Sequence, residues 1–375
     1  MTRIYFDNAA TTPMDPLVVE AMLPYLHSHF GNPSSIYSFG RETRLAIENA
    51  RKTVAGILNV KPGEIFFTSG GTESDNMAIR SAIEDLGCKH IITSPLEHHA
   101  VLHTITAAEK SHGVTTAMVN VLPNGHIDLS HLEQLLKNTK QRCLVSLMHA
   151  NNEIGNLLDV NAVGDLCRTY NAVFHSDTVQ TVGHYPLDFN QSNIHFATGA
   201  AHKFHGPKGI GILFISESVK VNPMIHGGGQ ERNMRAGTEN VPGIVGFAKA
   251  LEIASKQMET DQDHILRLKN LLANQLLQTI PGIRFNGDWD GQSLYTVLNV
   301  SFPRTPQSEL LLMSLDMQGI CVSAGSACSS GASQGSHVIQ AIPGEKEGVP
   351  IRFSFSKFNT EAEVNQLVQK LKETL

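Results

Sequence analysis

The fold is decided by three consecutive segments, CLVSLMHA (143–150), VNAVGDLCRTYN (160–171) and AVFHSD (172–177). The first and third are short apolar runs bounded by Asn or Asp, which is typical of buried strands. The middle segment repeats its apolar side chains at helical spacing, along a face formed by Val160, Val163, Leu166 and Cys167. A helix that connects two buried strands is the crossover of a parallel sheet, so these segments predict an α/β fold.

Further strands of the same kind are expected on both sides of this unit. Short apolar runs with Gly, Ser, Asn or Asp at their ends recur as EIFFTSGG (64–71), KHIITSP (89–95), IHFATGA (194–200) and GIGILFIS (209–216). Helical patterns separate several of these runs. The alternation predicts one large sheet flanked by helices.

The pattern changes after about residue 250. A long amphipathic helix is predicted at 251–280, and strands are predicted at IRFNGD (283–288), TVLNVSF (296–302) and IRFSFSKF (351–358). The last helix is expected to begin at the capping pattern formed by Thr360 and Glu363. A smaller α+β domain is therefore expected to close the chain.

The composition excludes several classes of protein. The 375 residues carry a formal net charge of −6 without a basic run, so no direct contact with nucleic acid is expected. The start, MTRIYFDNAATTP, is not a signal peptide, and no stretch reaches the roughly 20 apolar residues of a membrane span. A cytoplasmic protein is expected.

Five cysteines without a C-x-x-C pair indicate neither a disulfide framework nor a zinc site, so a functional cysteine would act as a thiol.

The segment FFTSGGTESDNMAIRSAIE (66–84) reads as a strand, a glycine turn and a helix. This arrangement directs backbone N–H groups and the positive end of the helix at one point near Gly71 and Thr72, which suits a phosphate or carboxylate. The alternative is a tight turn in which Thr72 caps the helix. The segment matches neither G-x-G-x-x-G nor the P-loop, which favours a smaller phosphorylated ligand over a nucleotide.

Two residues at predicted strand ends suggest a cofactor. Asp177 ends one buried strand, and His202 and Lys203 follow the next in AAHKFHGPKGIG. Each could be ordinary, Asp177 as a cap and Lys203 as a surface charge. Taken together with the helix start near Gly71, they favour pyridoxal phosphate. The carboxylate would pair with its protonated ring nitrogen, the amine would bind its aldehyde, and the helix start would bind its phosphate.

Three histidines, His98, His99 and His103, lie close together in SPLEHHAVLHT. Their spacing could suit a metal, but no acidic or cysteine ligand accompanies them, so no metal site is expected. An imidazole stacked on the cofactor is the favoured functional interpretation. Ordinary core or surface histidines are the alternative.

The loop AGSACSSGASQGSH (324–337) is rich in small residues, and we expect it to be mobile. It contains Cys328, which is the candidate reactive thiol, whereas Cys143 and Cys167 lie in apolar patterns and are expected in the core. Arg352, in a predicted strand, could clamp a substrate carboxylate. Its alternative is an ion pair at a sheet edge.

A series of motifs runs from Ile4 to the final helix: YFDNAATTP, FGNPSS, TSGGTESDN, EHHAVL, HANNEIG, SDTVQTVG, AHKFHGPKGIG, HGGGQERNMRAGTEN and SAGSACSS. Together they resemble the cysteine desulfurases of the class V aminotransferase group, in pyridoxal-phosphate fold type I. The long form of the cysteine loop is similar to the housekeeping and nitrogen-fixation branch, which favours cysteine over selenocysteine as the substrate.

The resemblance implies a large domain with a mostly parallel seven-stranded sheet flanked by helices, plus a smaller α+β C-terminal domain. Residues 15–255 are expected to form the large cofactor-binding domain. Residues 1–14 and 256–375 are expected to form the small one, which carries the mobile cysteine loop at about 323–337.

The resemblance also implies the catalytic residues Lys203, His98 and Cys328. Lys203 would hold the cofactor and move the substrate α-proton, and His98 would stack on the ring and handle protons. Asp177 would pair with the ring nitrogen. Cys328 would take the sulfur of L-cysteine as a persulfide, which leaves alanine.

Other cofactor contacts follow from the same resemblance: Gly71, Thr72, Asn152, Gln180, His202 and Thr238. Thr72 and His202 would bind the phosphate, and Gln180 would donate to the ring oxygen. Asn152 and Arg352 would position the substrate carboxylate.

Thr238 would reach the phosphate of the neighbouring subunit, which implies a homodimer with shared active sites. A persulfide implies sulfur-acceptor proteins, either an iron–sulfur scaffold or tRNA-thiolation proteins. The chain stops at Leu375, whereas longer members continue into a tail that helps to dock the scaffold, so the acceptor is left open.

One position departs from the family pattern. Ala200 stands where the family has Ser or Thr, so a phosphate hydrogen bond of about 1.5–3 kcal/mol is missing. Two alternatives are kept: a selenocysteine lyase or other class V enzyme, and a cofactor-free homologue, to which Ala200 lends some support. The long loop around Cys328 argues against the first, and retention of Lys203, Asp177 and His98 argues against the second.

Overall fold

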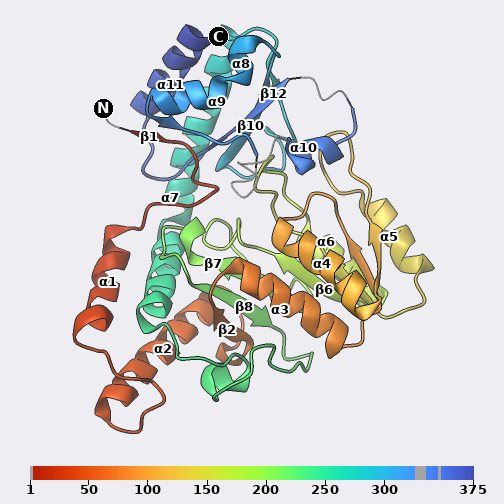
Figure 1. Ribbon diagram of the computed structural model, residues 1–375, viewed down its shortest axis with the longest axis vertical. Coiled ribbons are helices and arrows are strands. Elements are labelled where there is room, and N and C mark those ends of the chain that lie inside the picture. The colour runs from red at the N-terminus through yellow and green to blue at the C-terminus, as the bar shows by residue number, and fades with distance from the viewer. Residues whose placement is uncertain (1–2, 326–334, 345–347) are drawn as a thin grey trace.

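The protein is organised around one large sheet (Figure 1). The computed structural model describes residues 3–325, 335–344 and 348–375. Within these residues the sheet has seven strands, β2 (Ile65–Thr68), β8 (Gly211–Ile215), β7 (Phe196–Ala200), β6 (Val173–Asp177), β5 (Cys143–Ser146), β3 (His90–Thr93) and β4 (Thr115–Met118), given in their order across the sheet. Strands β7 to β4 run parallel, and β8 is antiparallel to β2 and β7. The predicted mostly parallel α/β sheet is confirmed.

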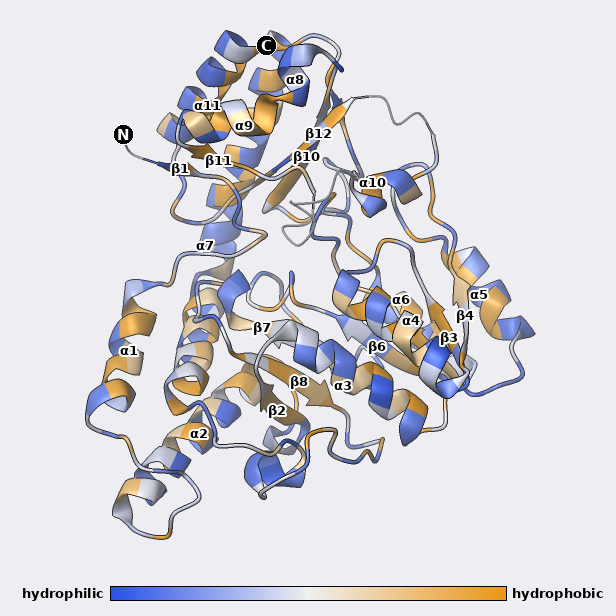
Figure 2. Ribbon diagram, viewed as in Figure 1, coloured by the Kyte–Doolittle hydropathy of each residue, from blue (hydrophilic) through white to orange (hydrophobic). Residues whose placement is uncertain are grey.

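Helices cover both faces of this sheet, and they are α2 (Ser38–Ile57), α3 (Gly71–Glu84), α4 (His99–His112), α5 (Leu129–Asn138), α6 (Val160–Thr169) and the first half of α7 (Val241–Thr279). Helix α1 (Pro16–His27) packs against α7. Successive strand residues point to opposite faces. Phe66, Ile91 and Leu144 pack with α3 and α4, whereas their neighbours Phe67, Ile92 and Val145 pack with the helices of the other face. Two covered faces explain why the strands read as continuous apolar runs. Figure 2 shows β2, β8 and β3 in hydrophobic colours.

The crossover helix that decided the fold class forms as predicted. Asp159 precedes α6, and its side chain accepts hydrogen bonds from the N–H groups of Asn161 and Ala162 at 3.1 and 3.0 Å. Val163 and Cys167 are buried on the predicted face. The helix therefore connects β5 to β6, which pair in parallel.

A second group of elements follows the large sheet, namely β9 (Arg284–Phe285), β10 (Val297–Phe302), α8 (Pro306–Glu309), α9 (Leu311–Met317), β11 (Ile320–Cys321), α10 (His337–Ala341), β12 (Val349–Ser354) and α11 (Glu361–Thr374). Strands β12, β10 and β9 form an antiparallel sheet with a core separate from that of the large sheet. The predicted capping box of α11 is present between Thr360 and Glu363.

Helix α7 joins the two groups. It begins at Val241, ten residues before the predicted start, and its first half packs into the large-sheet core through Ile244 and Leu251. Its second half packs into the other core through Leu268 and Leu276. The predicted domain limits near residue 255 stay a prediction.

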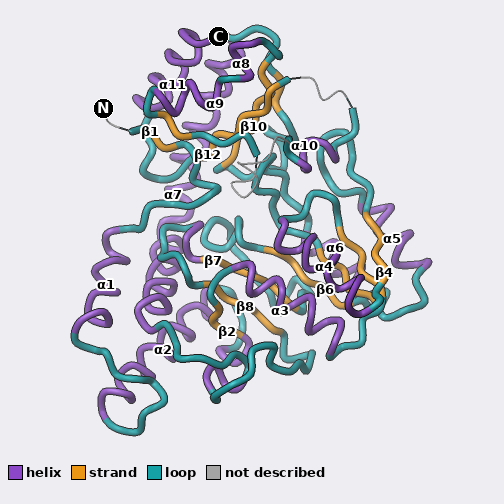
Figure 3. The backbone as a smooth tube through the Cα atoms, viewed as in Figure 1, coloured by secondary structure: helices purple, strands orange, loops and turns teal. Residues whose placement is uncertain are grey.

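The N-terminal segment crosses between the two groups. Strand β1 (Ile4–Tyr5) pairs in parallel with β11, and the chain then runs as a loop to α1 (Figure 3). Asn8 and Ser354 hold this loop against β12, because Asn8 Nδ2 donates to the Ser354 carbonyl at 2.9 Å. Among the described residues, no helix has both the length and the apolar content that crossing a bilayer requires.

Candidate active site

A cavity of about 250 Å³ opens at the carboxyl ends of β6 and β7. It brings together these sequence-predicted residues: Gly71, Thr72, His98, Asn152, Asp177, Gln180, His202, Lys203 and Arg352. Thr238 is exposed and does not line the cavity. Cys328 and most of the predicted mobile loop lie outside the described residues.

The glycine turn forms one wall of the cavity. Helix α3 begins at Gly71, so the unpaired N–H groups of its first turn lie beside the cavity. A Cβ atom on Gly71 would lie 2.8 Å from Cγ2 of Val179, which explains why glycine is needed here. The N-cap is Gly70 and makes no side-chain cap, so the alternative in which Thr72 caps the helix is wrong.

Lys203 lies at the end of β7, in a short 3-10 turn (Ala201–Lys203). Its Nζ donates to the carbonyl oxygens of Ala9 and Ala10 at 2.6 and 3.0 Å. The ring of His184 contacts the Lys203 carbonyl oxygen at 3.1 Å through Nε2. The N-terminal segment therefore forms a wall of the cavity, and the amine is held there.

Asp177 ends β6, as predicted, and is buried. Its Oδ1 accepts hydrogen bonds from Val179 N at 2.9 Å and Thr198 Oγ1 at 3.4 Å. Burial and the neighbouring Asp75 raise the pKa of Asp177, whereas His98 lowers it. A cationic group in the cavity would relieve this cost, because it would favour the charged carboxylate.

Asp75 is a cavity residue that sequence reasoning missed. It lies on α3 below the glycine turn, and burial raises its pKa to about 7. Its Oδ1 lies 3.4 Å from Nε2 of the buried His175. The signal was available, because Asp75 follows Gly71 by one helical turn and so lies on the same helix face.

His98 is the N-cap of α4, and this contact fixes its proton. Its Nδ1 accepts from Ala100 N at 3.1 Å, so the neutral ring carries its hydrogen on Nε2. Burial lowers the pKa of His98, which favours the neutral ring. Burial lowers the pKa of His202 to about 4, so this ring is also neutral, and its Nδ1 contacts Thr11 Oγ1 at 3.2 Å.

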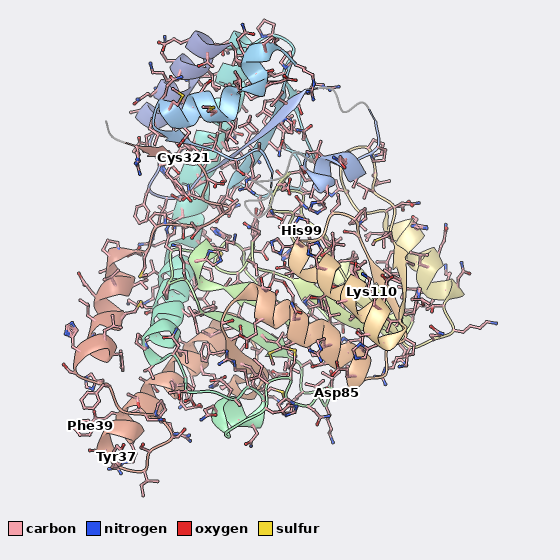
Figure 4. The ribbon with its side chains drawn as sticks, viewed as in Figure 1. Tyr37, Phe39, Asp85, His99, Lys110 and Cys321 are labelled. Carbon is pink, nitrogen blue, oxygen red and sulfur yellow. The ribbon has the colours of Figure 1, made fainter. Side chains whose placement is uncertain are left out.

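The other histidines form a stack beside the cavity. His99 lies at the start of α4 (Figure 4), with its ring centroid 4.8 Å from that of His103 and 4.6 Å from that of His337. In the part of the chain that the structure describes, no group of three or more His, Cys, Asp or Glu side chains is arranged to hold a metal ion.

Arg352 is 1% exposed and lines the cavity. Its Nη1 donates to the Asn152 carbonyl at 2.8 Å, and its Nη2 pairs with Asp7 at 2.6 Å. The ion pair considered as an alternative is therefore formed. Among the described residues, Arg352 Nε is buried without a hydrogen-bond partner.

The remaining predicted residues are Gln180 and the core cysteines. Gln180 Nε2 donates to the Ala9 carbonyl at 3.1 Å, so it contacts the same segment as Lys203. Cys143 and Cys167 are buried, as expected, and burial raises the pKa of Cys143 to about 12. These two thiols are not reactive candidates.

Known proteins with the same architecture identify the family. The aminotransferase class-V family model matches residues 4–367. The chain is 42% identical over 377 residues to the cysteine desulfurase IscS of Dictyoglomus turgidum, which covers 100% of this chain and 94% of that relative. A solved NifS-like protein is 39% identical with a TM-score of 0.91 and covers 99% of both chains. A structure of SspA in complex with cysteine is 29% identical with a TM-score of 0.82 and covers 96% of this chain and 100% of that chain. This chain belongs to the class-V aminotransferase family, and within it to the cysteine desulfurases.

Proposed function

We propose that the protein converts L-cysteine to L-alanine with pyridoxal phosphate and transfers the sulfur to Cys328 as a persulfide. One observation carries the proposal. The Lys203 amine, the Asp177 carboxylate and the start of α3 all border one cavity of about 250 Å³. The cysteine bound to the related SspA supports the choice of substrate.

The cavity fits this cofactor in three ways. Lys203 would hold its aldehyde, and the first turn of α3 with His202 would bind its phosphate. The cationic ring nitrogen would oppose the burial that raises the pKa of Asp177, and so would keep this carboxylate ionised. Gln180 would turn from Ala9 to the ring oxygen. When bound, pyridoxal phosphate withdraws electrons from the substrate carbon atoms and so makes them reactive.

The chain's own residues have the following roles in the mechanism. Arg352, with Asn152, would hold the substrate carboxylate, because both residues line the cavity. Lys203 would take and return the α-proton, and His98 would stack on the ring and donate from Nε2.

Sulfur transfer is balanced without an added oxidant. The Cys328 thiolate would form an S–S bond to the substrate sulfur while the substrate C–S bond breaks. The carbon skeleton would then take up protons and leave as alanine. The products are one alanine and one persulfide for each cysteine.

Absorption spectra and product assays test this proposal. The purified protein should show a band from the bound cofactor, which L-cysteine shifts, and should form alanine and, with a reductant, sulfide. Lys203→Ala should remove the band. Cys328→Ala should keep the band and its shift but lose product formation, while Cys321→Ser, in β11, serves as the control. Full turnover by Cys328→Ala would refute its role.

We also propose a homodimer with shared sites, because Thr238 is exposed and lies outside its own cavity. Exposed apolar side chains gather around α1 and the start of α2, where Figure 4 labels Tyr37 and Phe39. Such a surface suits a protein interface. The persulfide would pass to a cytoplasmic acceptor, an iron–sulfur scaffold or a tRNA-thiolation protein.

A further inference from the structure

A strained segment lies against the glycine turn. Glu231, Arg232 and Asn233 have φ angles of 43°, 56° and 65°, although none is glycine. Side chains disfavour this left-handed region, so a run of three such residues persists only where contacts hold it. We call residues 231–235 the brace.

One end of the brace is fixed to strand β2. Glu231 accepts hydrogen bonds from Nη1 and Nη2 of the buried Arg51, both at 2.8 Å. Its Oε2 also accepts from Phe67 N at 2.8 Å, and Arg51 Nη1 donates to the Ile65 carbonyl at 2.6 Å. The paired charges and two residues of β2, Ile65 and Phe67, are therefore joined in one buried network.

The other end of the brace is fixed to the first turn of α3. Arg235 donates from Nε to Glu73 Oε1 at 2.8 Å and from Nη2 to Glu73 Oε2 at 3.1 Å. Glu73 Oε2 accepts in turn from Ser69 N at 2.8 Å. The brace thus holds the strand before the glycine turn and the helix after it.

The negative charge of Glu73 opposes phosphate binding at the start of α3. Glu73 lies two residues after Gly71, and a carboxylate so close to the helix start repels an anion that binds there. Burial alone would raise the pKa of Glu73, but hydrogen bonds from Arg235 and Ser69 lower it below its ordinary value, so the side chain is ionised. Arg235 supplies the compensating charge.

We propose that Arg235 is a positioning residue for the cofactor phosphate, which it serves by neutralising the charge of Glu73 at the start of α3. The inference rests on the proposed function, because it assumes that pyridoxal phosphate binds at this turn. Arg235 itself does not line the cavity.

The test compares pyridoxal phosphate with pyridoxal, which lacks the phosphate. Both are titrated into cofactor-free protein, and the dissociation constants are measured by absorbance and fluorescence. Arg235→Gln should weaken pyridoxal phosphate about tenfold and leave pyridoxal nearly unchanged, because one uncompensated charge acts on the phosphate alone. Arg232→Gln is the matched control, since Arg232 lies in the brace but pairs with Glu48 at 2.8 Å on the surface.

Glu73→Gln keeps an oxygen acceptor for Ser69 and removes the charge. It should bind pyridoxal phosphate as tightly as the wild type or more tightly, and adding it to Arg235→Gln should restore affinity. Weaker binding by Glu73→Gln, or an equal loss for both ligands in Arg235→Gln, would overturn the proposal. Should Arg235→Gln not fold, Glu73→Gln alone decides. A wild type that does not bind pyridoxal phosphate would instead refute the proposed function.

Discussion

The side chain of Ala200 lacks the hydroxyl oxygen that a serine would place at the cavity wall, and this oxygen should affect phosphate affinity. Ala200 ends β7, is 1% exposed and lines the cavity beside Gly71. Ala200→Ser would place a hydroxyl there, and a hydrogen bond to a charged phosphate contributes about 1.5–3 kcal/mol. We expect the dissociation constant for pyridoxal phosphate, measured by titration, to fall by about tenfold or more. Pyridoxal, which lacks the phosphate, is the control ligand. Equal affinities of the wild type and Ala200→Ser for pyridoxal phosphate would contradict the prediction.

Glu97 should make the stability of the protein depend on pH. It is 1% exposed, Oε1 accepts from Ser94 Oγ at 2.8 Å, and burial raises its pKa to about 8. Because this pKa is higher in the folded than in the unfolded protein, the folded state binds more protons between about pH 5 and 8. The contribution of Glu97 to stability is therefore present at low pH and lost as the pH rises.

Glu97→Gln removes this titration. The free energy of unfolding of the variant, minus that of the wild type, should increase from pH 5 to pH 8 by up to about 1 kcal/mol per pH unit. Calorimetry at several pH values measures it. Glu109→Gln, at an exposed position on α4, is the control. A constant difference between Glu97→Gln and wild type across this range would disprove the assignment.

The sequence allowed most of the cavity to be predicted, because its residues follow strand ends and a glycine turn. Asp177 and Lys203 are such cases. Asp75, which lines the cavity, and Asp7, which pairs with Arg352 but does not line it, were missed for different reasons. Asp7 meets Arg352 only through contacts between distant parts of the chain, and Asp75 was treated as part of a helix rather than as a cavity wall.

Helix α6 packs closely against the backbone of Ser192 at Gly164. A Cβ atom on Gly164 would lie 2.0 Å from the carbonyl oxygen of Ser192, and a backbone atom cannot move aside cheaply. Gly164→Ala should therefore lower the free energy of unfolding by about 1–3 kcal/mol. Urea denaturation measures the effect.

Gly56 in α2 provides the matched control. A Cβ atom there meets nothing within 4 Å, so Gly56→Ala should raise stability by roughly 0.5–1 kcal/mol through helix propensity. Similar effects of the two substitutions, in either direction, would show that the contact with Ser192 does not govern the response.

Strand β4 and the start of α7 escaped prediction for physical reasons. Strand β4 (Thr115–Met118) lies at the sheet edge and is partly exposed, so it lacks the apolar run that marked the other strands. The start of α7 contains Pro242, Gly243 and Gly246, which are weak helix formers. A Cβ atom on Gly246 would lie 2.6 Å from Met22 Sδ on α1, so any larger residue there would make Met22 shift.

At the scale of the molecule, the exposed apolar surface predicts the oligomeric state. Ile36 is 89% exposed, and Phe30 stacks on Phe39 with a centroid distance of 5.4 Å. Burial of such side chains in a dimer is favourable, so Ile36→Asp should shift the protein toward monomer and weaken cofactor binding through loss of the partner's contacts. Sedimentation velocity measures the mass. Met317→Asp, on exposed α9, is the control, and a wild-type monomer would refute the interface.

The N-terminal wall also determines at what stage of protein synthesis the cavity can form. The carbonyl groups that hold Lys203 belong to Ala9 and Ala10, and this segment is fixed by a hydrogen bond from Asn8 to Ser354, 346 residues away. The ribosome makes this segment long before its partner in β12, and closing a loop of this length carries an entropic cost. The cavity is therefore completed only after β12 has been made, and a chain interrupted before β12 lacks a complete one.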